Sequence, residues 1–312
     1  MERLILTLTI NPAIDRNVTA DRLVFEDRAY IMSTDESAGG RGINASRVIH
    51  SFGGKTLAIL TSGGQTGAQF EKLVRAYGFP VEITPIHNEI RTNLTITDKQ
   101  GLTVKLNEAG PAMDGQELEA LEKAVLRHVE QARWLMLCGS IPPGVPSDFY
   151  ARLIEATRKK KVRTLLDTDG DALQSGMEAK PTVVHANQQE AERLLSAALL
   201  TRAQFFDAAR KLRAIGAGSV VLSLGSRGAV GTNGKVMVEA LPPRVDALCP
   251  IGAGDALAAA FTWAMDNGST FDDAMRWGVA AGTASAKLPG VSFASLGDTE
   301  ELYKLVEVRI TR

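Results

Sequence analysis

The chain has 312 residues, of which 45% are apolar and 23% charged, and its 35 basic and 36 acidic residues give a formal net charge of −1. This composition is typical of a globular protein and excludes collagen-like, disulfide-rich and intrinsically disordered chains. The near-zero charge argues against nucleic acid as a partner, because nucleic-acid-binding proteins usually carry a basic excess. No apolar run reaches the ~18 residues of a membrane span. We therefore expect a cytoplasmic protein with no membrane partner.

Strand-like and helix-like segments alternate along most of the chain. Short apolar, β-branched runs predict strands near the N-terminus and at 56–61, 134–138, 162–167, 182–185 and 219–224. Helix-like segments are found between them, for example at 66–77, 116–131 and 256–265. Buried strands separated by helices are typical of a parallel sheet covered on both faces. The sequence therefore predicts an α/β fold with a doubly wound, mostly parallel sheet flanked by helices.

Two polar, Thr-rich stretches interrupt this alternation, at 15–37 and 89–107. Their period-two pattern predicts antiparallel strands with one solvated face, which do not belong inside a parallel sheet. We interpret them as a small β lid that excludes water from a reacting phosphate. The expected division of the chain is a core of 1–10, 38–88 and 108–312 and a lid of 11–37 and 89–107.

The strongest local motif is 251–256, Ile-Gly-Ala-Gly-Asp-Ala, which leads into an apolar helix-like stretch. The small residues Gly252, Ala253 and Gly254 allow backbone N–H groups to converge on an anion at the helix N-terminus. Asp255 stands beside this anion site, where a fixed carboxylate can accept the proton of an attacking hydroxyl. A phosphoryl transferase needs this combination, whereas the alternative interpretation of Asp255 is a helix N-cap after a flexible turn.

Other polar and Gly-rich segments follow predicted strands or open predicted helices. A second Gly-rich turn at 38–44 contains Asn44, and Asn187 and Glu190 lie one helical turn apart after another strand. The segment 223–228 follows a further strand. Because open parallel sheets bind ligands at the ends of their strands, these segments are candidates for a shared site.

Taken in order, six motifs resemble those of the ribokinase-like, PfkB-type carbohydrate kinases: NPAID (11–15), GGRGIN (39–44), GSIPPG (139–144), NQQE (187–190), SLG (223–225) and GAGD (252–255). The resemblance extends over essentially the whole chain. The first and third motifs, together with the segment 91–93, are most similar to the branch that phosphorylates sugar phosphates. That branch holds 1-phosphofructokinase, tagatose-6-phosphate kinase and the minor-type 6-phosphofructokinase.

The resemblance implies a kinase that transfers the γ-phosphoryl of MgATP to a hydroxyl of fructose 1-phosphate, fructose 6-phosphate or tagatose 6-phosphate. It also implies a ribokinase-like α/β domain with a β-sheet lid, and a homodimer formed through that lid. The catalytic residues implied are Asp255 as the base, with Gly252, Ala253 and Gly254 as the anion hole. The acceptor-binding residues implied are Asp15, Gly39, Gly40, Asn44, Arg28, Arg91 and Ser140, with Arg91 holding the acceptor's own phosphate. The nucleotide-side residues implied are His185, Asn187, Ser223, Gly225 and Gly228, and Asn187 and Glu190 are implied to order Mg²⁺ through water.

Two positions depart from the family pattern. His185 stands where relatives usually carry a lysine near the phosphates, and Pro250 stands where a threonine is common before the GAGD motif. A histidine with its ordinary pKa is mostly neutral at pH 7, and proline removes an N–H donor. These changes leave two alternatives open: a non-catalytic or regulatory sugar-phosphate binder, and a kinase of a free sugar or nucleoside.

Overall fold

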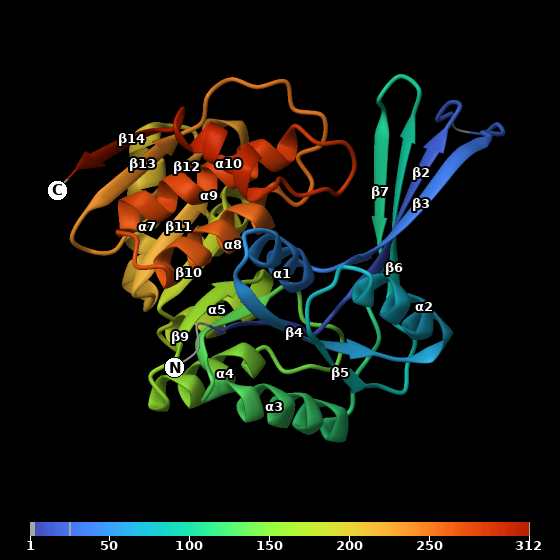
Figure 1. The fold of residues 1–312 in the computed structure, drawn as a ribbon, viewed down its shortest axis with the longest axis horizontal. Coiled ribbons are helices and arrows are strands. Elements are labelled where there is room, and N and C mark those ends of the chain that lie inside the picture. The colour runs from blue at the N-terminus through green and yellow to red at the C-terminus, as the bar shows by residue number, and fades with distance from the viewer. Residues whose placement is uncertain (1–3, 25, 312) are drawn as a thin grey trace.

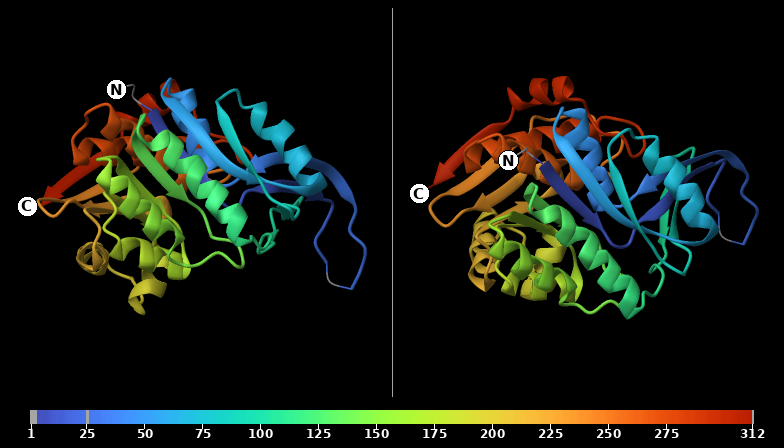
Figure 2. Two further views of the ribbon diagram at one scale, coloured as in Figure 1. Left: turned by 90° about the horizontal axis from the view of Figure 1, so that it is seen from below. Right: turned by 60° about the horizontal axis from the view of Figure 1, so that its bottom comes forward.

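The protein, described here from a computed structural model that covers residues 4–24 and 26–311, contains two separate β-sheets (Figures 1 and 2). The large sheet has ten strands in the order β14-β13-β12-β11-β10-β9-β8-β1-β4-β5. Its strands are β1 (Leu4–Thr9), β4 (Lys55–Ser62), β5 (Val81–Pro85), β8 (Ala132–Cys138), β9 (Arg163–Asp167), β10 (Val183–Asn187), β11 (Ser219–Ser223), β12 (Ala229–Thr232), β13 (Met237–Leu241) and β14 (Glu307–Thr311). Pairing is parallel from β5 to β11 and antiparallel from β11 to β14. The predicted mostly parallel sheet is confirmed.

Helices cover both faces of the large sheet. They are α1 (Arg41–Ser51), α2 (Gly64–Arg75), α3 (Gly115–Val129), α4 (Phe149–Lys159), α5 (Gly170–Glu178), α6 (Gln188–Leu195), α7 (Arg202–Ile215), α8 (Ala253–Asp266), α9 (Phe271–Ala286) and α10 (Leu296–Tyr303). Helices α1, α8, α9 and α10 pack together on one face, and α3 to α7 lie on the other. Among the described residues, no helix combines the length and the apolar character needed to cross a bilayer.

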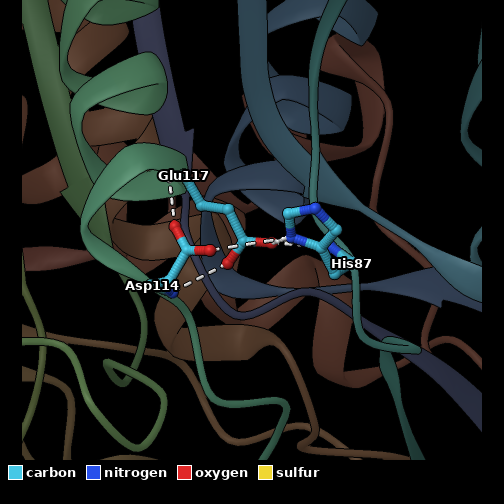
Figure 3. A group of neighbouring side chains, drawn as sticks. All are labelled: His87, Asp114 and Glu117. Carbon is cyan, nitrogen blue, oxygen red and sulfur yellow. Dashed lines mark hydrogen bonds and ion pairs between the residues drawn. The ribbon is translucent and has the colours of Figure 1, made fainter.

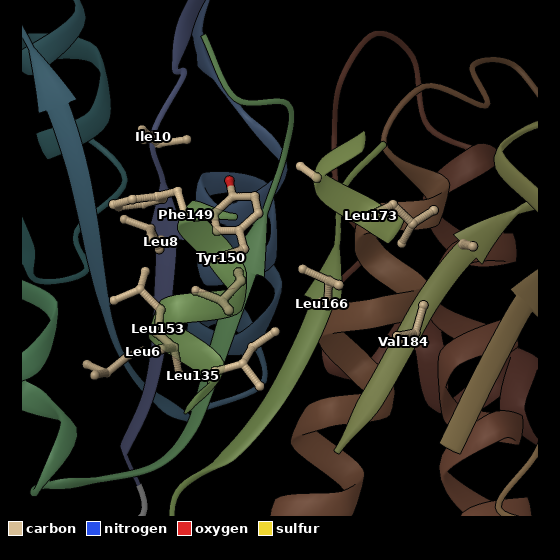
Figure 4. Close-up of a cluster of buried hydrophobic side chains, with 14 of the residues drawn as sticks. Leu6, Leu8, Ile10, Leu135, Phe149, Tyr150, Leu153, Leu166, Leu173 and Val184 are labelled. Atoms are coloured by element: carbon tan, nitrogen blue, oxygen red, sulfur yellow. The ribbon is translucent and has the colours of Figure 1, made fainter. Parts of the chain in front are cut away.

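The core forms because successive strand residues point to opposite faces of the sheet. On β1, Leu6 and Leu8 enter the layer beneath α3 and α4, where they meet Phe149 and Leu153 (Figure 4), whereas Ile5 enters the opposite layer. The centres of both layers are shielded from solvent, since these side chains are at most 2% exposed. Two apolar layers around one sheet are what the continuous apolar strands of the sequence predict.

The small sheet projects from the core as two hairpins (Figure 1). It is formed by β2 (Ala13–Ala20), β3 (Ile31–Gly39), β6 (Arg91–Asp98) and β7 (Thr103–Asn107), in the order β3-β2-β6-β7. The expectation of antiparallel pairing is confirmed for β2–β3 and β6–β7 but is wrong for the central pair, because β2 and β6 are parallel. Both strands leave the core in the same direction, after β1 and after β5, and only their hairpin partners return.

The strand ends of the large sheet lie along one edge. Thr9 pairs with Cys138 and Cys138 with Asp167, so the ends of β1, β8 and β9 are aligned. Asn187 pairs with Ser223 at the ends of β10 and β11, which extend about two residues further, because Leu166 of β9 pairs with Val184 of β10. The chain segments that leave this edge carry most of the polar motifs of the sequence. The topology therefore places the candidate site residues together.

Candidate active site

The phosphate-loop candidate forms the start of α8. Gly252 precedes the helix in a left-handed conformation with φ of 82°, and a Cβ atom there would lie 3.0 Å from a ring carbon of Phe293. The N–H of Ala253 donates to the carbonyl of Pro250. The N–H groups of the next two residues belong to the first helical turn, which has no intrahelical acceptors. Of the expected anion hole of Gly252, Ala253 and Gly254, the Ala253 N–H is thus used within the loop, whereas the N–H groups of Gly254 and of the following Asp255 remain available to an anion.

Asp255 is held by a residue from the opposite end of the chain. Asn44 of α1 donates from Nδ2 to Oδ2 of Asp255 over 2.7 Å. Burial of the carboxylate, followed by the charge of Asp167, raises the pKa of Asp255 to about 7, although Asn44, Arg41 and His185 act in the opposite direction. A carboxylate with a pKa near neutrality can accept a proton and release it again.

Arg41 is the centre of the charge network, and sequence reasoning did not assign it a role. Its guanidinium contacts Asp167 at 2.7 Å, Asp169 at 2.9 Å and Glu190 at 3.0 Å. The Asp167 and Glu190 side chains are 3% and 6% exposed, so their charges depend on this partner. Burial alone would lower the pKa of Arg41, but the attraction of Asp167, Glu190 and Asp255 raises it. A fixed positive charge therefore lies within reach of the Asp255 carboxylate.

Asn187 and Glu190 form the N-terminal cap of α6. The Asn187 side chain accepts from the N–H of Glu190, and Glu190 accepts from the N–H of Asn187, both over 2.9 Å. The second oxygen of Glu190 accepts from Arg41. Burial raises the pKa of Glu190. Amide and carboxylate oxygens are ligands that suit Mg²⁺. Because each of these three oxygens already accepts one hydrogen bond, the pair is suited to contact the ion through bound water.

His185 is buried in β10, two residues before the strand ends, and lies next to the phosphate-loop candidate. Its Nδ1 lies 2.9 Å from Asp167, and its Nε2 has no hydrogen-bond partner. The ring lies 3.6 Å from the position of a Cβ on Gly254. Burial opposes protonation, but the Asp167 carboxylate raises the pKa of His185 above its ordinary value. The residue that departs from the family pattern thus lies beneath the anion site.

The acceptor-side candidates meet where the lid joins the core. Asp15 on β2 accepts a 2.8 Å hydrogen bond from Asn93 on β6. The carboxylate packs directly against Gly39, because a Cβ on that residue would lie 2.0 Å from Oδ2 of Asp15. Gly40 follows at the N-terminus of α1. Burial raises the pKa of Asp15, although Asn93 and the charges of Arg91 and Arg47 oppose it.

Arg91, at the start of β6, lies on the same side. Its two terminal nitrogens donate to the carbonyls of Glu108 and Asn11 over 3.0 and 2.9 Å. Both acceptors are neutral, so the positive charge stays available to an anionic ligand. Asn11 in turn donates to Ala109 and, over 3.4 Å, to the hydroxyl of Ser140. The structure thus brings Arg91 and Ser140 together through Asn11.

The remaining sequence candidates occupy separate positions. Ser223 ends β11, and Gly225 and Gly228 close the tight turn after it, in which the Gly228 N–H donates to the Gly225 carbonyl. Arg28 is an exposed residue in the connection between β2 and β3, and its backbone N–H donates to the Asp27 carboxylate. That connection is at the outer end of the lid (Figure 1), far along the strand from Asp15. Within one chain, Arg28 is not brought to the site.

Unpaired polar atoms mark the same region as a ligand site. Eight buried side-chain polar atoms lack a hydrogen-bond partner in the described part of the chain, and buried polar groups are normally paired. Six of the eight belong to residues at the strand-end edge or the base of the lid: Thr9, Asn11, Asn44, Arg91, Asn93 and His185. A bound polar molecule would satisfy such atoms, as a sugar or a phosphate does.

A second titratable cluster lies outside this region and contains His87, Asp114 and Glu117 (Figure 3). One Glu117 oxygen accepts from the N–H and the ring Nδ1 of His87, and the other accepts from the N–H of Asp114. Asp114 in return accepts from the N–H groups of Gln116 and Glu117. The carboxylates are therefore engaged as the cap of α3, which is a structural role.

Comparison with known sequences agrees with this geometry. The family described as pfkB family carbohydrate kinase matches residues 6–296. The chain is 30% identical over 302 residues to ATP-dependent 6-phosphofructokinase isozyme 2 of Escherichia coli (strain K12), which covers 96% of this chain and 97% of that protein. It is also 30% identical over 284 residues to 1-phosphofructokinase of Borreliella burgdorferi, over 91% and 92% of the two chains.

Solved structures of related kinases also resemble this chain. Phosphofructokinase-2 from Escherichia coli in complex with fructose-6-phosphate superimposes with a TM-score of 0.90 at 30% identity, over 98% of this chain and 99% of that one. Arabidopsis thaliana ribokinase complexed with ribose and ATP shares the fold, with a TM-score of 0.77 at 21% identity over 97% and 99% of the chains. The ribokinase-like fold expected from the sequence is confirmed. The chain belongs to the pfkB family of carbohydrate kinases, enzymes that transfer a phosphoryl group to a hydroxyl.

Proposed function

We propose that the protein is an ATP-dependent sugar-phosphate kinase that transfers the γ-phosphoryl of ATP to a hydroxyl of a phosphorylated ketohexose. Fructose 6-phosphate, fructose 1-phosphate and tagatose 6-phosphate are the candidate acceptors. The observation that carries the proposal is the pairing of Asp255, with its raised pKa, to an anion site at the start of α8. Arg91, whose charge faces no carboxylate partner among its hydrogen bonds, supports a phosphorylated acceptor.

In the proposed mechanism, Asp255 accepts the proton of the attacking hydroxyl. Asn44 fixes the orientation of the carboxylate through its hydrogen bond to Oδ2. The N–H groups of Gly254 and Asp255 stabilise the negative charge that develops on the transferred phosphoryl. Arg41 pairs with Asp167, so that Asp167 and Asp255 do not both stand in the reacting region without a cation beside them.

The acceptor would be held by the groups at the base of the lid. Asp15 and Asn93 would present carboxylate and amide groups to sugar hydroxyls, and Gly39, which has no side chain, lets the Asp15 carboxylate pack against the chain at the start of α1. Arg91 would hold the acceptor's own phosphate, since a guanidinium fork matches phosphate geometry. The lid of 11–37 and 89–107 would close over the pair and exclude water.

The nucleotide would lie along the ends of β10 and β11. We assign its binding to His185, Asn187, Ser223, Gly225 and Gly228, which occupy these strand ends and the turn after β11. Asn187 and Glu190 would order Mg²⁺ through water, and the ion would neutralise charge on the donor phosphates.

We also propose that two copies associate through their lids. Leu94 faces Leu106 and Ile96 faces Val104 across β6 and β7, which forms an apolar row on one lid face. Leu106 is 54% and Val104 41% exposed, a pattern that favours a partner surface. Arg28 at the lid tip would reach an acceptor site only in such an assembly.

Leu106→Lys tests the lid dimer in light scattering after gel filtration. We expect a shift from dimer to monomer, with Leu200→Lys as the control, because Leu200 is exposed on the core. A Leu106 variant with the mass of the wild type would refute association through this face.

The activity is tested by ADP release with each candidate ketohexose phosphate and with the corresponding free sugars. We expect kcat/KM to be about 10- to 100-fold higher for a phosphorylated acceptor, since a charge-assisted phosphate contact is worth ~1.5–3 kcal/mol. Equal use of free sugars or nucleosides would instead identify a kinase of a free sugar or nucleoside. Binding of the sugar phosphate without ADP release would identify a regulatory binder instead.

A further inference from the structure

A stack of three side chains lies beside the site, and none of its members has a role in the mechanism above. The Cζ of Arg47 on α1 is 4.3 Å from the centre of the Tyr77 ring and 4.7 Å from the centre of the Phe293 ring. Arg47 also donates from Nη1 to the carbonyl of Val291 over 3.4 Å. The guanidinium is therefore held between two aromatic rings that come from distant parts of the chain.

One end of the stack rests on the phosphate-loop candidate. The Phe293 ring fills the space where a Cβ of Gly252 would lie, with ring carbons at 3.0 and 3.1 Å from that position, and Val291 approaches it at 3.6 Å. Because Gly252 has a positive φ immediately before α8, the loop's conformation depends on what packs against it. Phe293 and Val291 are the side chains that pack there.

The other end of the stack rests on the acceptor side. The Tyr77 hydroxyl donates to the carbonyl of Ala38 over 3.0 Å. The next residue, Gly39, packs against the Asp15 carboxylate. Asn44, the partner of Asp255, lies three residues before Arg47 on α1, and residues at this spacing share one face of a helix.

We propose that Arg47 is a positioning residue that fixes the phosphate loop at Gly252 relative to the acceptor strand at Ala38 and Gly39, acting through Phe293 and Tyr77. Phosphoryl transfer requires donor and acceptor atoms to be held about 3–3.5 Å apart, and a misplacement of about 1 Å can reduce the rate ~100-fold. Loss of the stack should therefore lower kcat while each substrate still binds. The activity part of this inference rests on the proposed kinase function.

The test compares Arg47→Met, which keeps the length of the side chain without its charge, with Arg47→Lys, which keeps a cation over the rings. We expect Arg47→Met to lower kcat about 10- to 100-fold with both KM values within threefold, and Arg47→Lys to recover part of the loss. Arg163→Met is the matched control, because Arg163 stacks on Trp134 at 4.4 Å at the opposite end of β9 from Asp167. A kcat of Arg47→Met within threefold of the wild type would overturn the proposal.

A double-variant cycle tests whether Arg47 acts through Phe293. If it does, Phe293→Leu combined with Arg47→Met should lose no more kcat than the more damaging single change. Losses that multiply would show independent effects and overturn the coupling.

Hydrogen exchange gives a readout that does not depend on turnover. Amides of 251–255 and of the non-proline residues in 287–295 should exchange at least about threefold faster in Arg47→Met and remain unchanged in Arg163→Met. Unchanged exchange in Arg47→Met would overturn the proposal even if no acceptor were found. A wild-type enzyme inactive with every candidate acceptor, combined with faster exchange in Arg47→Met, would refute the kinase assignment while supporting the positioning role.

Discussion

Asp255→Asn should stabilise the fold while removing activity. The folded protein holds the Asp255 carboxylate partly buried and near Asp167, and this raises its pKa from 3.8 to about 7. At pH 8 the group is charged in both the folded and unfolded states, so folding carries the full cost of placing the charge there. Below about pH 4 the group is protonated in both states, and that cost disappears.

The size of the effect follows from the shift. The difference between 3.8 and about 7 corresponds to ~4 kcal/mol as an upper limit. Solvent at this partly exposed site and the shared titration with Asp167 reduce the expected gain to ~1–3 kcal/mol at pH 8. At ~2–4 °C per kcal/mol, Tm should rise by about 2–12 °C. Asparagine keeps the shape of the side chain and can still accept the hydrogen bond from Asn44.

Thermal unfolding at pH 8 and pH 5, together with ADP release, measures both effects. We expect Asp255→Asn to be more stable at pH 8, to lose most of that advantage at pH 5, and to have ~10²–10⁴-fold lower kcat. Asp246→Asn removes the same charge from an exposed position and serves as the control. A variant that keeps more than about a tenth of the wild-type kcat, or that is destabilised at pH 8, would refute the role of Asp255 as a base held at a cost to stability.

Four further outcomes follow from the site. Arg91→Ala should raise KM for the phosphorylated ketose ~10- to 100-fold and leave KM for ATP within threefold; equal increases would indicate a damaged lid. The kcat/KM of the wild type should fall about tenfold per pH unit below about 7, because only deprotonated Asp255 accepts a proton; a profile flat down to pH 5 would exclude this base. Arg41→Met should lower the free energy of unfolding by ~3–5 kcal/mol, since it removes the guanidinium partner of the buried Asp167 and Glu190 carboxylates, and denaturant unfolding that matches the wild type would contradict this. His185→Lys should lower KM for ATP by placing a permanent charge beneath the phosphates, and an unchanged KM would make His185 a packing residue.

Local sequence motifs predict local geometry where that geometry depends on neighbours in the chain. The cap formed by Asn187 and Glu190 and the helix start at Gly252 both arise within a few residues. The alternation of apolar strands and helices likewise predicts the sheet, because each strand is buried by its own pattern.

Contacts between distant segments could not be predicted in the same way. Asn44 meets Asp255 across 211 positions of the chain, and Arg41 meets Asp167 across 126. Arg41 belongs to a motif that is defined by its glycines. Its ionic role depends on the carboxylates of β9 and α6, which only the fold brings beside it. The parallel pairing of β2 and β6 was missed for a similar reason, since it depends on where both strands leave the core and not on their side-chain pattern.

The most direct test of the proposed function is the mass of the product formed from ATP and fructose 6-phosphate, fructose 1-phosphate or tagatose 6-phosphate by the wild type and by Asp255→Asn. We expect a ketohexose bisphosphate from at least one acceptor with the wild type, formed in equal amount to ADP, and at least about 100-fold more slowly with the variant. ADP formed without any bisphosphate, or bisphosphate formed equally fast by both proteins, would contradict a sugar-phosphate kinase that uses Asp255 as its base.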